Sequence, residues 1–349
     1  MYHVADVNGE LVIEGDQQVC VTCVLPESFP EISFDESGVC SYCLDQDERI
    51  ENSKGAIQEA LSRIAGEEWS GRAYDCLLLY SGGKDSSLAL VSLVRDHGLR
   101  VLAMTLDNGF LAQATTGNMR TMVDGVGADH LVFRPQKGMM HGMYRAAMTT
   151  PMGPDTIKYS TAACGSCIGL VLSMGMRMAT AHGIPLLAGG WTPGQFTTSA
   201  FVPSSFLQEV STRNLDPIKL TDTNLERSLS EWTRATDHGP LGLINPLYAT
   251  DYTESGAVES LRAFGWVPPK ETDSCSTNCR LNSLLIVDHV KRHGFHPYVY
   301  EMAHHVRLGA MTRDEALLKL RRLELTSEAV GAVAVELGMP SFHLNEKGN

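Results

Sequence analysis

The feature that most constrains this chain is a glycine-rich loop placed between a buried strand and a helix. The run 76–80 (CLLLY) is wholly apolar and predicts a strand buried on both faces. Ser81-Gly-Gly-Lys-Asp-Ser-Ser87 follows directly, and a helical apolar face then extends to Arg95. Two glycines allow a tight turn, and the free amides at a helix start attract anions. The loop therefore predicts a phosphate site, although its spacing matches neither a Walker A loop nor a G-x-G-x-x-G fingerprint.

Strands and helices continue to alternate after this loop. Residues 101–107 predict a second buried strand and residues 130–133 a third strand, separated by a helical stripe of apolar residues over 119–126. A long helix over 168–181 and an apolar strand over 184–189 follow. Buried strands separated by helices indicate an α/β fold with a doubly wound parallel sheet.

Other segments divide the chain further. Ligands of such sheets lie at the carboxyl ends of strands, so Asp107 is expected beside a nucleotide, although Asp107-Asn-Gly also fits a plain turn. Residues 195–239 are polar without a clear period and predict a lid or an extended excursion. Helical patterns return from 244 onward, with a capping box starting at Thr312. We expect four units: a zinc ribbon over 1–48, a linker helix over 49–72, a nucleotide-binding domain over 73–245 and a helical region over 246–349.

Eight of the 9 cysteines form four close pairs, and Cys76 alone stands apart as a small core residue. No export signal precedes them, so the chain is predicted to be cytoplasmic and its paired thiols to serve metal or redox chemistry rather than disulfides. The first two pairs follow the spacing C-x2-C-x16-C-x2-C of a ribbon-type zinc site. Because four thiolates leave no open position, we expect structural zinc, with a redox or cluster role as the alternative; the ligands are Cys20, Cys23, Cys40 and Cys43.

Net charge and hydropathy limit the classes of binding partner that the chain is expected to have. The formal net charge of −13 disfavours nucleic acid unless a local basic patch compensates. Positive residues do gather between Lys291 and Arg322, and they could form either a nucleic-acid-binding surface or a solvent-exposed helical face. No uninterrupted apolar run reaches the ~20 residues of a membrane helix, so a membrane role is not expected.

The run Ser81–Ser87, with the strand and helix order over 74–190, resembles the PP-loop (N-type ATP pyrophosphatase) superfamily. That resemblance implies cleavage of ATP between its α- and β-phosphates and adenylation of a substrate oxygen. The departing pyrophosphate would lie in the loop with Mg²⁺ bridging, and Lys84 and Asp85 would take part in catalysis. The nucleotide-binding residues implied are Ser81, Gly82, Gly83, Lys84, Asp85, Ser86, Ser87 and Asp107.

The remaining cysteine pairs bear on the nucleophile. Cys164 and Cys167, expected just before the long helix, and a distant third cysteine resemble the cluster-dependent tRNA thiolases. The resemblance implies that three cysteines hold a [4Fe–4S] cluster that carries sulfide to the activated carbon. Either Cys275 or Cys279 would be the third ligand. Two alternatives stay open: a second zinc bound by all four thiols, and a persulfide on Cys164 and Cys167 that resolves as a disulfide.

A second resemblance gives another nucleophile. Residues 20–43 and 306–316 are similar to the N-acetyl sugar amidotransferases, in which a glutaminase partner supplies ammonia. We favour sulfur, delivered by a donor protein or as sulfide, because ammonia transfer needs no further cysteines. The substrate is then a nucleobase-like or sugar-like small molecule, with a tRNA base and a homodimer left open. A non-catalytic, ATP-sensing zinc-ribbon adaptor is the remaining alternative. Candidate substrate contacts are Trp191, Gln195, Arg280, His304 and His305.

Overall fold

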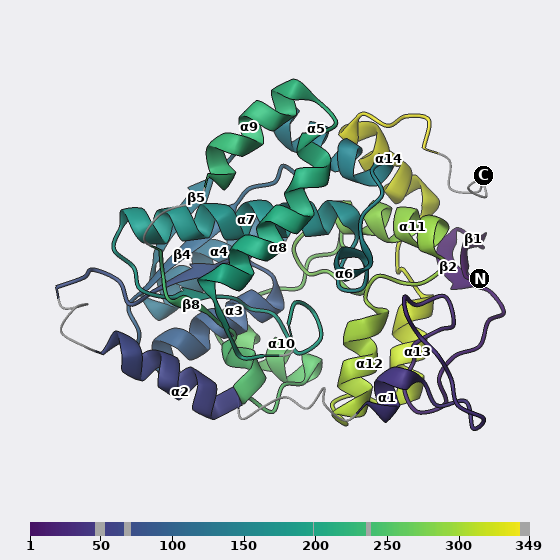
Figure 1. Ribbon diagram of the computed structural model, residues 1–349, viewed down its shortest axis with the longest axis horizontal. Helices are drawn as coiled ribbons and strands as arrows, with labels where there is room; N and C mark the ends of the chain where they lie inside the picture. The colour runs from purple at the N-terminus through teal and green to yellow at the C-terminus, as the bar shows by residue number, and fades with distance from the viewer. Residues whose placement is uncertain (46–52, 66–70, 198, 235–238, 343–349) are drawn as a thin grey trace.

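A computed structural model describes the chain except for residues 46–52, 66–70, 198, 235–238 and 343–349 (Figure 1). Its centre is a six-stranded sheet in the order β5-β4-β3-β6-β8-β7. All neighbours pair in parallel except β7, which is antiparallel to β8. The strands are β3 (Cys76–Leu79), β4 (Val101–Leu106), β5 (Asp129–Phe133), β6 (Leu187–Ala188), β7 (Phe201–Pro203) and β8 (Gly242–Ile244). The predicted α/β class with a mostly parallel sheet is confirmed.

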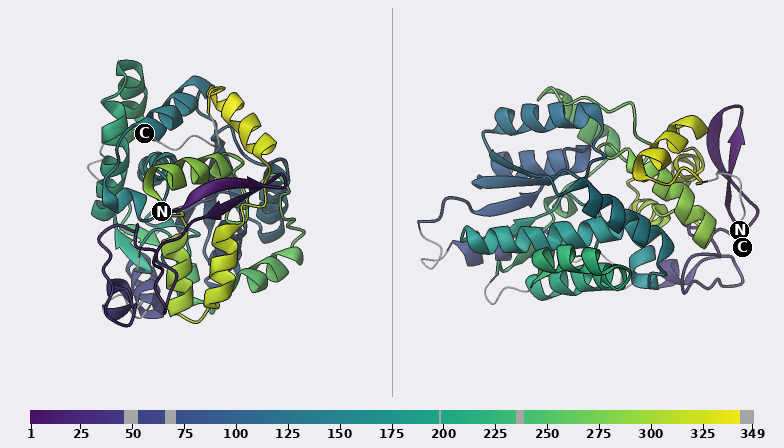
Figure 2. Two further views of the ribbon diagram at one scale, coloured as in Figure 1. Left: turned by 90° about the vertical axis from the view of Figure 1, so that its right-hand side faces the viewer. Right: turned by 90° about the horizontal axis from the view of Figure 1, so that it is seen from above.

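Successive residues of the central strands face two different cores, which explains their continuous apolar runs. Leu77 and Leu79 of β3 point into one core, while Cys76 and Leu78 point into the other. Helices cover both faces of the sheet, as Figure 2 shows. The first core is closed by α5 (Lys137–Thr149), α7 (Ala162–Ala181) and α8 (Ser204–Lys219). The second is closed by α2 (Ser53–Ile64), α3 (Lys84–Val91), α4 (Gln113–Val126) and α10 (Glu254–Arg262).

The structure corrects two predictions about helices. Residues 195–239 are not a long excursion, because they contain β7, α8 and α9 (Thr223–Thr233). The apolar residues Leu225 and Leu229 lie one helical turn apart on α9 and are buried. Helix α7 begins at Ala162, so Cys164 and Cys167 lie inside its first turns rather than before it. By length and composition α7 could cross a membrane, but 67% of its most apolar window is buried within this fold.

The N-terminal segment packs against the C-terminal helices, as Figures 1 and 2 show. Strands β1 (His3–Val7) and β2 (Glu10–Glu14) form an antiparallel hairpin beside α11 (Leu281–His293) and α13 (Arg313–Arg321). The short helix α1 (Ser41–Leu44) follows the hairpin. The predicted capping box is present at the start of α13, where Thr312 and Glu315 bond reciprocally. Further elements are α6 (Pro154–Ile157), α12 (Val299–Arg307), α14 (Ser327–Leu337), a π-helical turn over Ser92–Asp96 and a 3-10 helix over Pro246–Ala249.

Candidate functional site

The loop between β3 and α3 has the backbone that its glycines predict. Gly82 has φ +73°, and a Cβ there would lie 2.6 Å from the Cγ of Met119, so only glycine fits without strain. Gly83 is the N-cap of α3, which leaves amides of the first turn facing the loop. A Cβ on Gly190, just past β6, would lie 2.3 Å from the Cα of Ser86. The carboxyl end of β6 therefore lies directly against the loop.

Lys84 is the centre of a buried charge network. Its side chain is 8% exposed, and its Nζ lies 2.9 Å from Asp85 Oδ2 and 3.5 Å from Glu254 Oε1. Burial opposes the charge of Lys84, but the neighbouring carboxylates raise its pKa well above the usual value. Lys319 of α13 bonds the other oxygen of Glu254, and Tyr252 donates to Asp85. Lys84 is therefore a fixed positive charge at the helix start, where it favours an anionic ligand.

The segment between α10 and α11 closes over this loop. The Lys84 amide donates to the Thr277 hydroxyl at 2.9 Å, so one of the helix-start amides bonds the protein itself. Asp273 holds the segment in shape, because it accepts bonds from the amides of Cys275 and Ser276 and from the side chain of Asn282. The loop 81–87 and the amides of Cys275 and Cys279 thus all bond this one polar turn.

Two adjoining cavities lie at the carboxyl ends of the central strands. The first encloses about 190 Å³ between the loop residues Ser81 and Lys84, the indole of Trp191, and α12. The second encloses about 260 Å³, and its wall is mostly apolar, with Met104 and Leu285 among its residues. The two cavities share lining residues, namely Ser81, Ser86, Cys164, Ile168, Gly190, Trp191, Ser276, Asn278, Asn282 and Tyr298. The two cavities therefore share one wall.

The four later cysteines divide between these cavities. Cys164, Cys167 and Cys279 line the second cavity, and Cys164 lines the first as well. Cys275 lines the first cavity but not the second. Burial raises the pKa of all four thiols, to about 11 for Cys167, so they are neutral in the metal-free protein. Three thiols on one cavity wall match the number of ligands predicted for a cluster.

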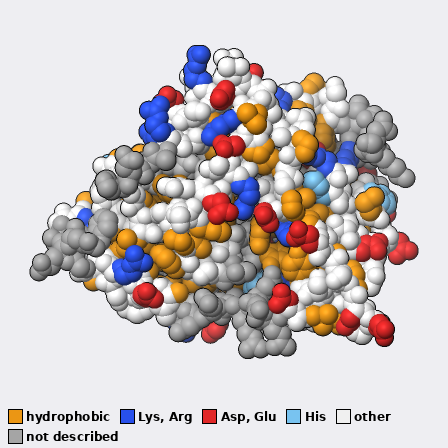
Figure 3. All heavy atoms as spheres, in the orientation of Figure 1, with side chains coloured by type: hydrophobic (Ala, Val, Ile, Leu, Met, Phe, Trp, Pro, Cys, Tyr) orange, Lys and Arg blue, Asp and Glu red, His pale blue; other side chains and the backbone are white. Residues whose placement is uncertain are grey.

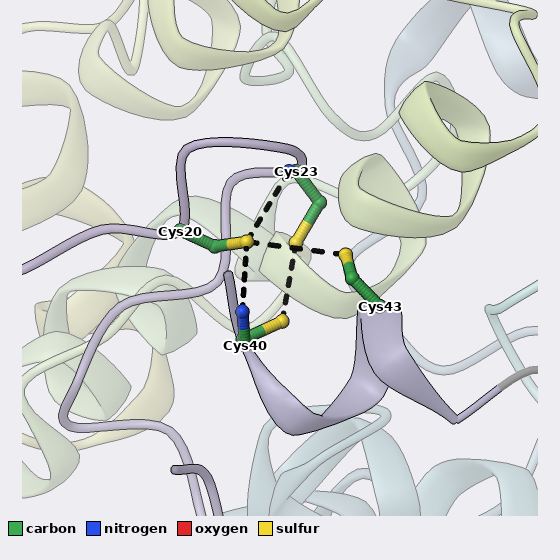
Figure 4. A group of neighbouring side chains, drawn as sticks. All are labelled: Cys20, Cys23, Cys40 and Cys43. Atoms are coloured by element: carbon green, nitrogen blue, oxygen red, sulfur yellow. Dashed lines mark hydrogen bonds between the residues drawn. The ribbon is translucent and has the colours of Figure 1, made fainter. Parts of the chain in front are cut away.

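The N-terminal cysteines form a separate, closed group, shown in Figure 4. The Sγ atoms of Cys20 and Cys43 are 3.9 Å apart, and those of Cys23 and Cys40 are 3.7 Å apart. A tetrahedron of sulfurs about 2.3 Å from a zinc ion has edges of about 3.8 Å. Within the described part of the chain, this is the group whose Cys, His, Asp and Glu ligand atoms lie close enough to enclose one ion. Its geometry fits zinc, whereas Cys164, Cys167, Cys275 and Cys279 do not form a second such group.

The cysteine knuckle, residues 18–44, is held against the C-terminal helices. The Arg313 guanidinium of α13 donates to the backbone carbonyls of Cys20 and Cys23, at 3.0 and 2.8 Å in its shortest bonds. The ring of Phe29 stacks on that of Tyr300 in α12, with 2° between their planes and 5.6 Å between their centroids. The cysteine knuckle therefore supports α12, the helix that lines the first cavity.

Glu301 is a site residue that the sequence did not indicate. It follows Tyr300 on α12 and is only 7% exposed, yet its Oε1 accepts bonds from the Thr192 hydroxyl at 2.9 Å and the Gln195 amide at 2.8 Å. Burial raises the pKa of Glu301 to about 7, although Lys84 opposes the rise. The carboxyl group lies on the wall of the first cavity and can hold a proton near neutral pH.

Several other candidate residues have structural partners. Asp107 accepts a bond from the Gly109 amide at 3.0 Å and pairs with Arg134 at 3.4 Å; the next residue, Asn108, lines the second cavity. Arg280 pairs with Glu336 at 3.1 Å. Burial lowers the pKa of both His304 and His305 to about 4, so neither offers a positive charge to an anionic substrate at pH 7. Trp191 lines both cavities and stacks on Phe196.

Comparisons with known proteins give distant likenesses. No family model matches the chain. An uncharacterised protein of Methanocaldococcus jannaschii is 22% identical over 314 residues, which is 88% of this chain and 95% of that protein. Similar solved structures include the U34-tRNA thiolase NcsA from Methanococcus maripaludis with its [4Fe-4S] cluster, at 13% identity and TM-score 0.34, covering 85% of this chain and 88% of that one. They also include an NMN synthetase from Francisella tularensis, at 18% identity and TM-score 0.28, covering 53% and 79%. Likenesses this distant assign no activity to the chain.

Proposed function

We propose that this chain is a PP-loop ATP pyrophosphatase that adenylates a carbonyl or amide oxygen of its substrate and replaces that oxygen with sulfur. The observation that carries the proposal is the shared wall of the two cavities. The phosphate loop borders one cavity, three cysteines border the other, and Cys164 borders both. A site of this kind can bring an activated carbon next to a sulfur source without moving the substrate.

In the first step, the substrate oxygen bonds to the α-phosphorus of ATP and pyrophosphate leaves. The positive end of helix α3 and the Lys84 ammonium would stabilise the departing pyrophosphate, with Mg²⁺ as the accompanying ion. In the second step, a sulfur nucleophile attacks the carbon, and the original oxygen leaves with AMP. A carbonyl oxygen is a poor leaving group, and adenylation makes its departure feasible.

The three cysteines suit a [4Fe–4S] cluster. Cys164 and Cys167 lie one helical turn apart on α7, and Cys279 reaches the same cavity from the turn before α11. When bound, such a cluster would supply an iron with an open position for sulfide. Placement on the second cavity favours Cys279 over Cys275 as the third ligand. The zinc of the knuckle has a structural role in this proposal.

A small substrate is favoured over tRNA. The basic residues that gather between 291 and 322 make internal bonds: Arg292 donates to the carbonyl of Met148, Arg313 to carbonyls of the knuckle, and Lys319 pairs with Glu254. These contacts leave fewer of the charges for a phosphate backbone. The first cavity, about 190 Å³ in volume, has an indole and a buried carboxyl group on its wall, which suits a planar molecule with a polar edge.

A sugar amidotransferase is the second candidate, and one contact favours it. The two segments that resemble that family, 20–43 and 306–316, touch each other through Arg313. Ammonia from a glutaminase partner would then displace AMP in place of sulfur. Both candidates share the loop, the adenylate and the release of pyrophosphate.

Anaerobic purification followed by iron, sulfide and zinc quantitation tests the proposal. We expect about four irons and four sulfides beside one zinc, and iron should be lost in Cys164→Ser while zinc is kept. Cys76→Ser, which changes a buried cysteine of β3, is the matched control and should keep both metals. Two zincs without iron would refute the sulfur reading. Pyrophosphate release from ATP, assayed against a panel of nucleobases and N-acetyl sugars, separates either enzyme from a non-catalytic ATP sensor.

A further inference from the structure

Two of the three cysteines of the second cavity receive a hydrogen bond from a buried polar side chain. The Asn108 amide donates to Cys279 Sγ at 3.3 Å, and the Tyr144 hydroxyl donates to Cys167 Sγ at 3.5 Å. Neither donor belongs to the phosphate loop or to a cysteine motif. Each comes from a different element: Asn108 follows β4, and Tyr144 lies in the middle of α5.

We propose that Asn108 and Tyr144 are positioning residues that stabilise the iron-bound, anionic sulfurs of Cys279 and Cys167, and this inference rests on the proposed function. An iron-bound sulfur carries negative charge and accepts a stronger hydrogen bond than a neutral thiol does. Donors to ligand sulfurs therefore raise the affinity for a cluster and shift its reduction potential upward.

The orientation of both donors is fixed by their surroundings. The Asn108 Oδ1 accepts a bond from the Phe110 amide at 2.8 Å, and this bond directs the amide nitrogen toward Cys279. The Tyr144 side chain is only 1% exposed and contacts Phe110 edge to face, with 6.1 Å between centroids. A hydroxyl buried in an apolar core needs a partner, and Cys167 provides it.

The third cysteine is stabilised in another way. The Cys164 amide donates to Thr161 Oγ1, the N-cap of α7, which places Cys164 in the first turn of a 20-residue helix. The positive end of the helix dipole favours a negative sulfur there. In this structure the Cys164 thiol donates a hydrogen bond to Asn282 Oδ1 at 3.7 Å. This bond can form only while Cys164 keeps its proton. Each of the three sulfurs thus has its own means of bearing charge once iron is bound.

Tyr144→Phe is the main test, because it removes the donor and keeps the ring. After anaerobic reconstitution of the full chain with iron and sulfide, we expect a more negative reduction potential by EPR-monitored titration. We also expect a cluster affinity about 10- to 100-fold lower, measured as iron lost to a chelator. Asn108→Asp is the second variant: it keeps an oxygen for the Phe110 amide but presents no amide donor to Cys279, and it should change both quantities in the same direction.

Tyr80→Phe is the matched control. Tyr80 also lines the second cavity, but its hydroxyl bonds Ser87 at 3.2 Å rather than a cysteine, so its loss should leave potential and iron retention unchanged. Zinc content reports that each variant has folded. If Tyr144→Phe and Asn108→Asp both match the wild type in potential and iron retention, the inference is overturned while the proposed function stands. A wild-type chain that takes up no iron overturns both.

Discussion

Replacing Glu301 by Gln should change how the stability of this protein depends on pH. The folded structure raises the pKa of this carboxyl group from 4.5 to about 7, mainly because burial removes water from it. Each pKa unit corresponds to about 1.4 kcal/mol, so ionising Glu301 in the fold costs about 3 kcal/mol more than ionising it in the unfolded chain. Below pH 4.5 the group is protonated in both states, and this cost is absent.

The wild type should therefore lose about 3 kcal/mol of unfolding free energy, relative to Glu301→Gln, as the pH rises from about 4.5 to about 7. Above pH 7 the difference should stay constant. Gln resembles the protonated acid and keeps an oxygen that can accept from Thr192 and Gln195. Urea titrations of both proteins at several pH values measure the difference, in which the other titrating groups cancel.

Glu315 offers a control, because its contribution to the unfolding free energy should change with pH in the opposite direction. Glu315 is exposed, and its bonds to Thr312 lower its pKa, so its contribution is present at neutral pH and is lost as the pH falls toward acid. Glu315→Gln should differ from the wild type most at high pH and converge with it at low pH. A pH dependence of Glu301→Gln that parallels the wild type from pH 5 to 8 would refute the assignment of Glu301 as a group that holds its proton near neutrality.

Three further outcomes are expected. Gly190→Ala should weaken the binding of α,β-methylene-ATP by at least tenfold in calorimetry, since its Cβ would lie 2.3 Å from the loop backbone. The control Gly117→Ala, whose Cβ would meet nothing within 4 Å, should bind the nucleotide normally and gain about 0.5 kcal/mol of stability. Thr277→Val should tighten binding of the same nucleotide several-fold, because it frees the Lys84 amide, and unchanged affinity would contradict that role. Cys40→Ser should lose its zinc by metal analysis and melt at a lower temperature, whereas full zinc occupancy would show that Cys40 is not a ligand.

The centre of the sheet could be predicted because β3 and β4 are buried on both faces. The run 76–79 is wholly apolar, the run 101–106 has Thr105 as its one polar residue, and the helices between such strands carry a regular apolar stripe. The start of α7 was harder to place, because Cys164-Gly-Ser has weak helical propensity. Two glycines of α7, Gly165 and Gly169, allow neighbouring helices to pack closely. A Cβ on Gly165 would lie 2.9 Å from Thr156, and one on Gly169 would lie 3.1 Å from Leu215. The close approach of α6 and α8 favours helix where local preference does not.

The cavity wall was less predictable than the loop. Glu301 bonds residues that are 109 and 106 positions away, so no local pattern marks it. The same holds for Asn108 and Tyr144, whose partners are 171 and 23 residues distant. Spacing identified the cysteines, since thiols four or fewer residues apart are conspicuous in any chain. It could not decide between Cys275 and Cys279, because only the fold of the turn around Asp273 separates them into different cavities.

Two adjacent residues of helix α12 make contacts with different parts of the molecule. Tyr300 turns outward to the aromatic rings of the knuckle, and Glu301 turns inward to the strand-end residues. A change that loosens the packing of the knuckle against Tyr300 would allow α12 to move, and the carboxyl group of Glu301 would move with it. If the knuckle binds zinc and the first cavity binds ATP as proposed, the zinc supply of a cell would then affect nucleotide binding through α12, without contact between the zinc and the nucleotide.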